Sequence, residues 1–162
     1  MAENPTIRRA EARDAEAVAA LANMLAVAVE DHPPGVGVMT SEIVRRDLID
    51  APGLTLLVAE RSDDIVGYAL LTAAYETSYA ARGVHLVDLA VAENARRSGV
   101  GRALMRAAAH EAVATGGCYV SWVVAQKNRA GQAFYNRIGG VCDPVEARAI
   151  FGPPFDALLD QD

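Results

Sequence analysis

The chain has 162 residues, of which 52% are hydrophobic and 22% charged, and this composition is typical of one globular domain spanning residues 1–162. Its apolar residues fall in short runs and its N-terminus lacks a signal-like pattern, so we expect no membrane partner and a cytoplasmic protein. A net charge of −6 opposes a nucleic-acid partner and favours a cationic substrate, while two cysteines without metal-ligand spacing predict no metal site.

The first half of the chain is predicted from apolar periodicity and from turn residues. Val18, Leu21 and Leu25 recur on one helical face, whereas the runs after Pro52 and Gly53 are rich in β-forming residues. The predicted elements are a strand at Thr6–Arg9, a helix capped by Asp14, a loop at His32–Gly37, a helix from Thr40 or Ser41 to Asp50, and strands Leu54–Glu60 and Ile65–Tyr75.

The second half alternates strands and helices. Gly116 and Gly117 end one helix, and Gly139 ends another that Asn128 caps. The predicted elements are a strand at Val84–Ala92, a helix at Gly99–Ala114, a strand at Cys118–Ala125, a helix from Asn128, one or two strands around Ala147–Phe151, and a short terminal turn. This order predicts a mixed α/β sandwich rather than a doubly wound sheet.

The segment Arg96–Arg102 joins a predicted strand to the start of a helix. Free amides and the positive end of a helix dipole form an anion site there. Gly99 and Gly101 let the backbone approach an anion closely, and the arginines add positive charge. The segment is therefore suited to a diphosphate, although a Gly-rich turn can also simply begin a helix on a solvated surface.

Two other phosphate-binding motifs are disfavoured. A kinase-type loop needs G-x-x-x-x-G-K-[ST], but the only lysine is Lys127. A dinucleotide fold needs G-x-G-x-x-G directly after its strand, but Leu104 stands at the third glycine position.

The pattern R-x-x-G-x-G between strand and helix is similar to the acetyl-CoA signature of the GCN5-related N-acetyltransferase (GNAT) family. Ile7–Asp14, Val87–Val91 and Asn128–Gly139 resemble, in order, the opening strand and helix, the fourth strand and the second cofactor motif of that family. Within the family the chain looks most like the diamine (spermidine-type) acetyltransferases. The resemblance implies an α/β (α+β) acyl-CoA N-acyltransferase fold, with a mixed, mostly antiparallel twisted sheet of six to seven strands, helices on both faces and splayed central strands.

The resemblance also implies where acetyl-CoA, the co-substrate, binds. The backbone of the fourth strand would pair with the pantetheine arm, the Arg96–Arg102 segment would hold the pyrophosphate, and Asn128 would hydrogen-bond the arm from the other side. Gly131 would leave room beside Tyr135. The implied cofactor-binding residues are Leu89, Ala90, Val91, Arg96, Arg97, Ser98, Gly99, Val100, Gly101, Arg102, Asn128, Gly131 and Tyr135.

The resemblance also implies that Tyr135 lies near the thioester sulfur, and the chemistry of acetyl transfer to an amine explains the residue types found there. A backbone N–H near Leu89 or Ala90 would stabilise the oxyanion, and the Tyr135 hydroxyl would protonate the departing thiolate. An amine with a pKa of about 10 must first lose a proton. Asp88 is the candidate base and substrate-binding residue, although the diamine acetyltransferases carry Glu-Asp where this chain has Val87-Asp88. The alternatives are that Asp88 is a hydrogen-bonded structural residue and that Tyr135 is an ordinary core tyrosine.

Other polar residues are weaker candidates. Glu30, Asp31 and His32, at the end of the first helix, are candidate contacts for a cationic substrate or a solvated helix end. Strand alternation predicts that His85 faces away from Asp88, and Trp122 is interpreted as a core or interface residue.

The leading hypothesis is acetyl-CoA-dependent transfer to a primary amine of a small molecule, such as a polyamine, a diamine or an amino-acid side chain. One alternative is acetylation of a peptide or protein amine, and another is a non-catalytic acyl-CoA-binding regulatory module. The family resemblance suggests a homodimer.

Overall fold

The computed structural model describes residues 4–29 and 37–159. In chain order they form strand β1 (Thr6–Arg9), a 3₁₀ turn (Ala12–Asp14), helices α1 (Ala15–Val29) and α2 (Ser41–Ile43), a π-helical turn (Val44–Ile49), strands β2 (Leu54–Arg61), β3 (Asp64–Glu76) and β4 (Ala81–Val91), a 3₁₀ turn (Glu93–Ala95), helix α3 (Val100–Ala114), strand β5 (Tyr119–Trp122), and helices α4 (Arg129–Arg137) and α5 (Pro153–Leu159).

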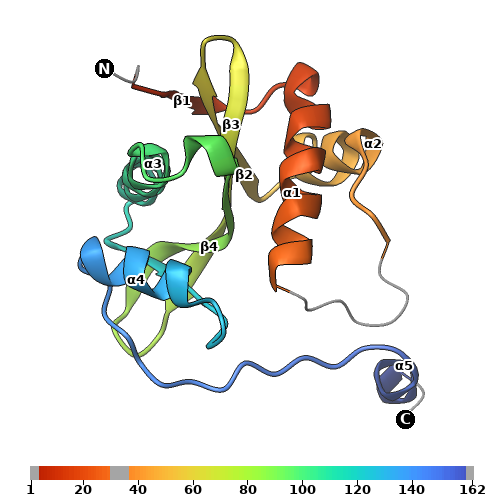
Figure 1. The fold of residues 1–162 in the computed structure, drawn as a ribbon. Coiled ribbons are helices and arrows are strands. Elements are labelled where there is room, and N and C mark those ends of the chain that lie inside the picture. Colours follow the sequence, from red (N-terminus) through yellow and green to blue (C-terminus); the bar gives the residue numbers. More distant parts are fainter. Residues whose placement is uncertain (1–3, 30–36, 160–162) are drawn as a thin grey trace.

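The described strands form one sheet in the order β1-β2-β3-β4-β5. Neighbours are antiparallel except for β4 and β5, which run parallel. Helices α1 and α2 lie on one side of the sheet, and α3 and α4 lie on the other (Figure 1). The predicted mixed, mostly antiparallel sheet with helices on both faces is therefore confirmed.

Each face of the sheet has its own apolar core. Val18 and Leu21 of α1 pack with Leu56, Val58 and Tyr68 on one face. On the other face five residues of α3 at helical spacing are all buried: Val100, Leu104, Met105, Ala108 and Ala112. The helical periodicity of the sequence thus located both cores.

Asp14 acts at the start of α1 in a different way from the one predicted. It ends the 3₁₀ turn before the helix, and its carboxylate accepts a hydrogen bond from the Glu11 amide at 2.7 Å. It also accepts from Arg8 at 2.7 Å, and Arg8 donates to Glu60 at 2.6 Å. This ion-pair network ties the start of α1 to β1 and β2.

Strands β4 and β5 are paired over only four residues. Gly83–Leu86 lies opposite Tyr119–Trp122, and β5 then ends, whereas β4 continues to Val91. Residues 88–91 of β4 thus have partners in β3 but none in β5. This splay gives the sheet an open edge in its interior.

A β-bulge in β4 changes which side chains share a face. Leu70 pairs with Asp88 and Leu71 pairs with Leu86, so Val87 is the inserted residue. Thr72, which is on the same face of β3 as Leu70, pairs with His85. His85 and Asp88 therefore lie on the same face, and the prediction from simple alternation that they face opposite ways is wrong.

The end of the chain differs from the prediction. The sheet has five strands within the described residues instead of six or seven, and the segment around Ala147–Phe151 is not a strand. All side chains from 141 to 151 are exposed, so this segment has no neighbouring strand to supply hydrogen bonds. It leads into α5, a helix where only a short turn was predicted, and runs apart from the sheet (Figure 1).

Among residues 4–29 and 37–159, none of the helices has both the length and the apolar character needed to cross a bilayer.

Candidate active site

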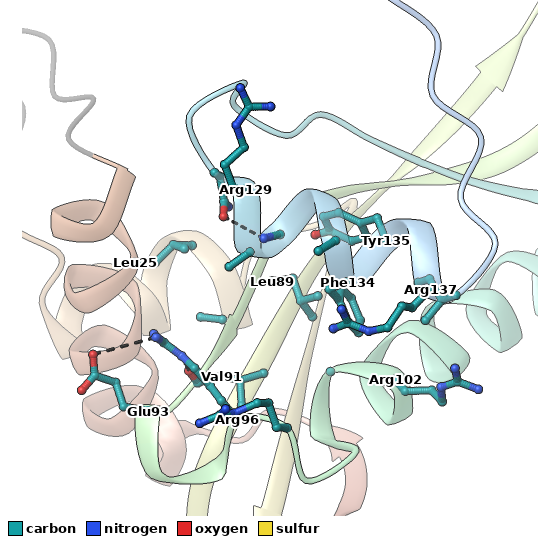
Figure 2. A pocket seen from close by; sticks show the side chains of 18 of the residues that line it. Leu25, Leu89, Val91, Glu93, Arg96, Arg102, Arg129, Phe134, Tyr135 and Arg137 are labelled. Carbon is teal, nitrogen blue, oxygen red and sulfur yellow. Dashed lines mark hydrogen bonds and ion pairs between the residues drawn. The ribbon is translucent and has the colours of Figure 1, made fainter.

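A cavity of about 1030 Å³ lies beside the splay of β4 and β5. Its walls come from α1, the end of β4, the loop that precedes α3, and α4. Arg96, Arg102 and Arg137 gather along one side of it, and Arg129 lies at the other (Figure 2). The segments that the sequence analysis singled out, far apart in the chain, therefore meet around one cavity.

The loop before α3 has the backbone that an anion site requires. Gly99 has φ +90°, in the left-handed region that glycine tolerates best, and it is the N-cap of α3. Arg97 is also left-handed, at φ +61°. Gly99, Gly101 and Arg102 line the cavity at the positive end of the helix dipole, where the first amides of a helix lack partners within the helix.

Gly101 has a packing role in addition to any role near an anion. A Cβ at this position would lie 3.3 Å from Cζ of Phe134, so the missing side chain lets α4 approach the first turn of α3. The glycine therefore helps to bring the two cofactor motifs of the sequence together.

Six cationic side chains line the cavity. The sequence analysis identified Arg96, Arg97 and Arg102; the structure adds Lys127, Arg129 and Arg137. Lys127 and Arg129 directly flank the predicted cap Asn128, which was a signal that could have found them. Arg96 also holds the loop, since its Nε donates to the Val91 carbonyl at 3.1 Å and its guanidinium lies 3.9 Å from Glu93.

Two predicted residues of the loop do not line the cavity. Val100 is part of the core under α3. The Ser98 hydroxyl donates to the Ala95 carbonyl at 2.7 Å and accepts from Arg61 at 3.0 Å. Both residues therefore shape the loop from beneath, and neither is placed to touch a ligand in the cavity with its side chain.

The open edge of β4 presents backbone groups to the cavity. The Ala92 amide donates to Val66 on β3, and because antiparallel pairs alternate, the backbone of Ala90 is also paired with β3. The backbone groups of Leu89 and Val91 point the other way, towards the missing β5. Of the three predicted positions, Leu89 and Val91 are thus the ones whose amides and carbonyls face the open edge.

Asn128 and Gly131 form the N-cap of α4. Asn128 Oδ1 accepts from the Gly131 amide at 2.9 Å. A Cβ on Gly131 would lie 2.7 Å from Asn128 Nδ2, so the glycine makes room for the asparagine side chain. The expectation that it clears space beside Tyr135 is replaced by this local requirement.

Tyr135 is half-buried at the back of the cavity. Its ring is packed between Trp122, with centroids 4.8 Å apart, and Phe134, with centroids 5.1 Å apart. Burial and the negative charge of Asp88 both raise the pKa of Tyr135. The hydroxyl thus stays protonated at neutral pH, the state in which it can donate a proton.

Asp88 lies near the cavity but is not part of its wall. It is half-buried, and its carboxylate accepts a hydrogen bond from the Tyr68 hydroxyl at 3.3 Å. Burial raises the pKa of Asp88, and the hydrogen bond from Tyr68 partly opposes that rise. The other predicted substrate residues, Glu30, Asp31 and His32, lie outside the described residues.

The residues of this cavity fit an acyl-CoA. Six cations suit its phosphates, and the first amides of α3 suit the pyrophosphate. The backbone groups of Leu89 and the amide of Val91 face the open edge and suit an amide-containing arm, whereas the Val91 carbonyl already accepts from Arg96. In the described part of the chain, no group of three or more His, Cys, Asp or Glu side chains is placed to hold a metal ion.

Comparisons with known proteins agree with this fit. A sequence profile of the acetyltransferase (GNAT) family matches residues 20–140. The L-ornithine N5-acetyltransferase NATA1 of Arabidopsis thaliana is 30% identical over 93 residues, which make up 56% of this chain and 41% of that protein. The matched part thus spans less than half the length of this relative.

Solved structures share the fold. An integron cassette protein from the mobile metagenome of V. cholerae superposes with a TM-score of 0.78 at 19% identity, covering 98% of this chain and 99% of the other. A ribosomal-protein-alanine N-acetyltransferase from Brucella melitensis biovar Abortus 2308 gives a TM-score of 0.74 at 19% identity, covering 92% and 100%.

Proposed function

The chain belongs to the GNAT acetyltransferase family, and from this premise we propose that it transfers an acetyl group from acetyl-CoA to a primary amine of a small molecule. Diamines and amino-acid side chains are the proposed classes. The observation that carries the proposal is Asp88, a half-buried carboxylate with no ion pair among the described residues, close enough to Tyr135 for its charge to raise the pKa of that hydroxyl. A carboxylate in this setting attracts a cationic amine.

The proposed cofactor site uses the cavity as described. The amides at the start of α3, with Arg97 and Arg102, would hold the pyrophosphate, and Leu89 and Val91 would pair with the arm of CoA. Arg96 and Ser98 would keep the loop in its shape through their hydrogen bonds to Val91 and Ala95. When bound, acetyl-CoA supplies an activated thioester carbonyl that a free amine attacks, with CoA leaving as a thiolate.

Asp88 and Tyr135 would carry out the proton transfers of the reaction. The acceptor arrives as an ammonium, and Asp88 removes one proton so that the nitrogen lone pair becomes available. Tyr135 donates its proton to the departing sulfur. The remaining extra proton on the nitrogen restores Tyr135, and Asp88 releases its proton to solvent, so that one proton leaves per acetyl transferred.

The test is a thiol-release assay on purified protein with a panel of diamines, amino acids and peptides. Tyr135→Phe should lower turnover about 100-fold or more while CoA affinity stays within about twofold, because a general acid contributes that much to the rate. Tyr79→Phe, in the exposed turn between β3 and β4, is the matched control and should behave as the parent.

The outcomes separate the alternatives. Equal turnover in Tyr135→Phe and its parent would remove Tyr135 from the mechanism. Activity on peptides alone would replace the small-molecule acceptor by a peptide or protein amine. Tight CoA binding without transfer to any member of the panel would favour the regulatory module.

We also propose that the protein is a homodimer. The support is the segment 141–159, whose large apolar side chains are exposed, up to 94% for Val141, and include Phe151, Phe155 and Leu158. Exposed apolar surface of this extent is typical of an interface. Sedimentation should give a mass of twice the 17.1 kDa chain for the parent protein, and the mass of a single chain for the double variant Phe155→Ser, Leu158→Ser. A parent protein that sediments as a monomer contradicts the proposal.

A further inference from the structure

Tyr68 is a buried polar residue that the proposed mechanism does not use. Its side chain is 1% exposed and packs in the core between α1 and the sheet. A phenylalanine would fill nearly the same volume, so packing alone does not account for the hydroxyl. A buried tyrosine hydroxyl needs a hydrogen-bond partner, and this one donates to Asp88 Oδ2 at 3.3 Å.

The β-bulge makes this contact possible. Tyr68 pairs with Ala90, and Leu70 pairs with Asp88, so Tyr68 and Asp88 are diagonal neighbours on one face of β3 and β4. If Val87 took an ordinary paired position in place of the bulge, alternation from Leu86 onward would turn Asp88 to the opposite face. The bulge thus aims Asp88 towards the α1 side of the sheet, where Tyr68 is the neighbour that binds it.

The surroundings of Asp88 contain few other groups that could control its charge. On its own strand His85 shares the face, and from α4 Tyr135 is near enough for the charge of Asp88 to raise the pKa of its hydroxyl. From α1 the side chains packed on this face of the sheet, such as Val18 and Leu21, are apolar. Asp88 has no ion pair among the described residues, so burial raises its pKa and the Tyr68 hydrogen bond is the opposing influence.

We propose that Tyr68 is a positioning residue for acetyl transfer: its hydroxyl holds Asp88 Oδ2, favours the ionised carboxylate, and leaves Oδ1 to accept the proton of the amine. In the described residues Oδ1 has no hydrogen-bond partner. The hydroxyl of Tyr68 itself stays protonated, because burial and the charge of Asp88 both raise its pKa. This inference rests on the proposed role of Asp88 as the base.

The test follows the carboxyl of Asp88 directly, by its ¹³C chemical shift against pH, with Asp88→Asn to assign the signal. Tyr68→Phe removes the donor, so the midpoint should rise by about 1 pH unit, the size expected for a hydrogen bond to a charged group. The low-pH limb of kcat/KM for the amine should shift upward by the same amount, while CoA affinity is unchanged. Tyr75→Phe removes an exposed hydroxyl from the same strand and should leave both profiles in place.

The outcomes are distinguishable. A midpoint that stays or falls in Tyr68→Phe overturns the proposal for Tyr68. A low-pH limb that persists in Asp88→Asn shows that Asp88 is not the base; this overturns the positioning role and leaves the acetyltransferase assignment standing. If Tyr68→Phe does not fold, Tyr68→Met, whose flexible side chain adapts to the same space, is titrated in the same way.

Discussion

Replacing Gly99 by alanine tests whether the left-handed N-cap of α3 is needed for CoA binding. Gly99 has φ +90°, and a Cβ there would meet nothing within 4 Å, so the substitution adds backbone strain without a clash. A left-handed alanine costs about 1–2 kcal/mol. If the free loop relaxes to escape this strain, CoA must restore the strained form, and the dissociation constant should rise about five- to thirtyfold.

Gly116→Ala is a closely matched control. Gly116 has φ +76°, also has nothing within 4 Å of a Cβ, and follows the other end of the same helix, away from the cavity. It should lower the melting temperature by about 2–8 °C, since 1–2 kcal/mol gives such a shift in a chain of this size. Its CoA affinity should equal that of the parent.

Isothermal titration calorimetry with CoA and thermal melts of both variants complete the test. A Gly99→Ala protein that binds CoA as tightly as the parent would refute the reasoning, because the strained turn would then have no part in binding. Equal losses of affinity in both variants would instead show that general destabilisation of α3 causes the effect.

Three further predictions concern stability and charge. The Arg8 hydrogen bonds lower the pKa of Asp14, so this carboxylate stabilises the folded state above the unfolded pKa of about 4, and the stabilisation is lost as pH falls through the lower folded pKa. Asp14→Asn should therefore lower the free energy of unfolding in urea by about 3 kcal/mol at pH 7 and by much less at pH 2. Asp47→Asn, in an exposed ion pair, should not show this loss. Leu104→Ala, at a site with no exposure, should cost about 2–5 kcal/mol in the same assay, whereas Val113→Ala on the exposed face of α3 should cost under about 0.5 kcal/mol. Arg102→Ala should weaken CoA binding about tenfold at low salt and less at 0.5 M NaCl by calorimetry, and Arg148→Ala, outside the cavity, should not.

Local patterns in the sequence predicted most of the fold. The apolar stripe of α3 and the caps at Thr40 and Asn128 are determined by residues within a few positions of one another, and these elements formed where expected. The C-terminal strand did not form, because a strand also needs a partner at its side, and the residues near 147–151 have none. Propensity alone does not contain that information.

The candidate site was predicted in part. The loop from Arg96 to Arg102 and the helix after Asn128 are continuous motifs, so their residues were found. Tyr68 and Arg137 were missed because they reach the site through the register of β3 with β4 and the packing of α4. His85 was misplaced because a single inserted residue, Val87, is not visible in the alternation of an apolar strand.

The insertion of Val87 also limits how the length of β4 can change. Leu89 lies three positions after Leu86, yet both side chains pack on the α3 side because Val87 is bulged. Deleting Val87 would leave plain alternation through Leu86, Asp88 and Leu89, so each of these side chains would keep its face. Natural variants that lack Val87 should therefore keep Asp88 on the α1 side, whereas a single-residue deletion after Asp88 would exchange the faces of the residues that follow it and should inactivate and destabilise the protein. Loops such as that between β3 and β4 can vary in length without moving either face.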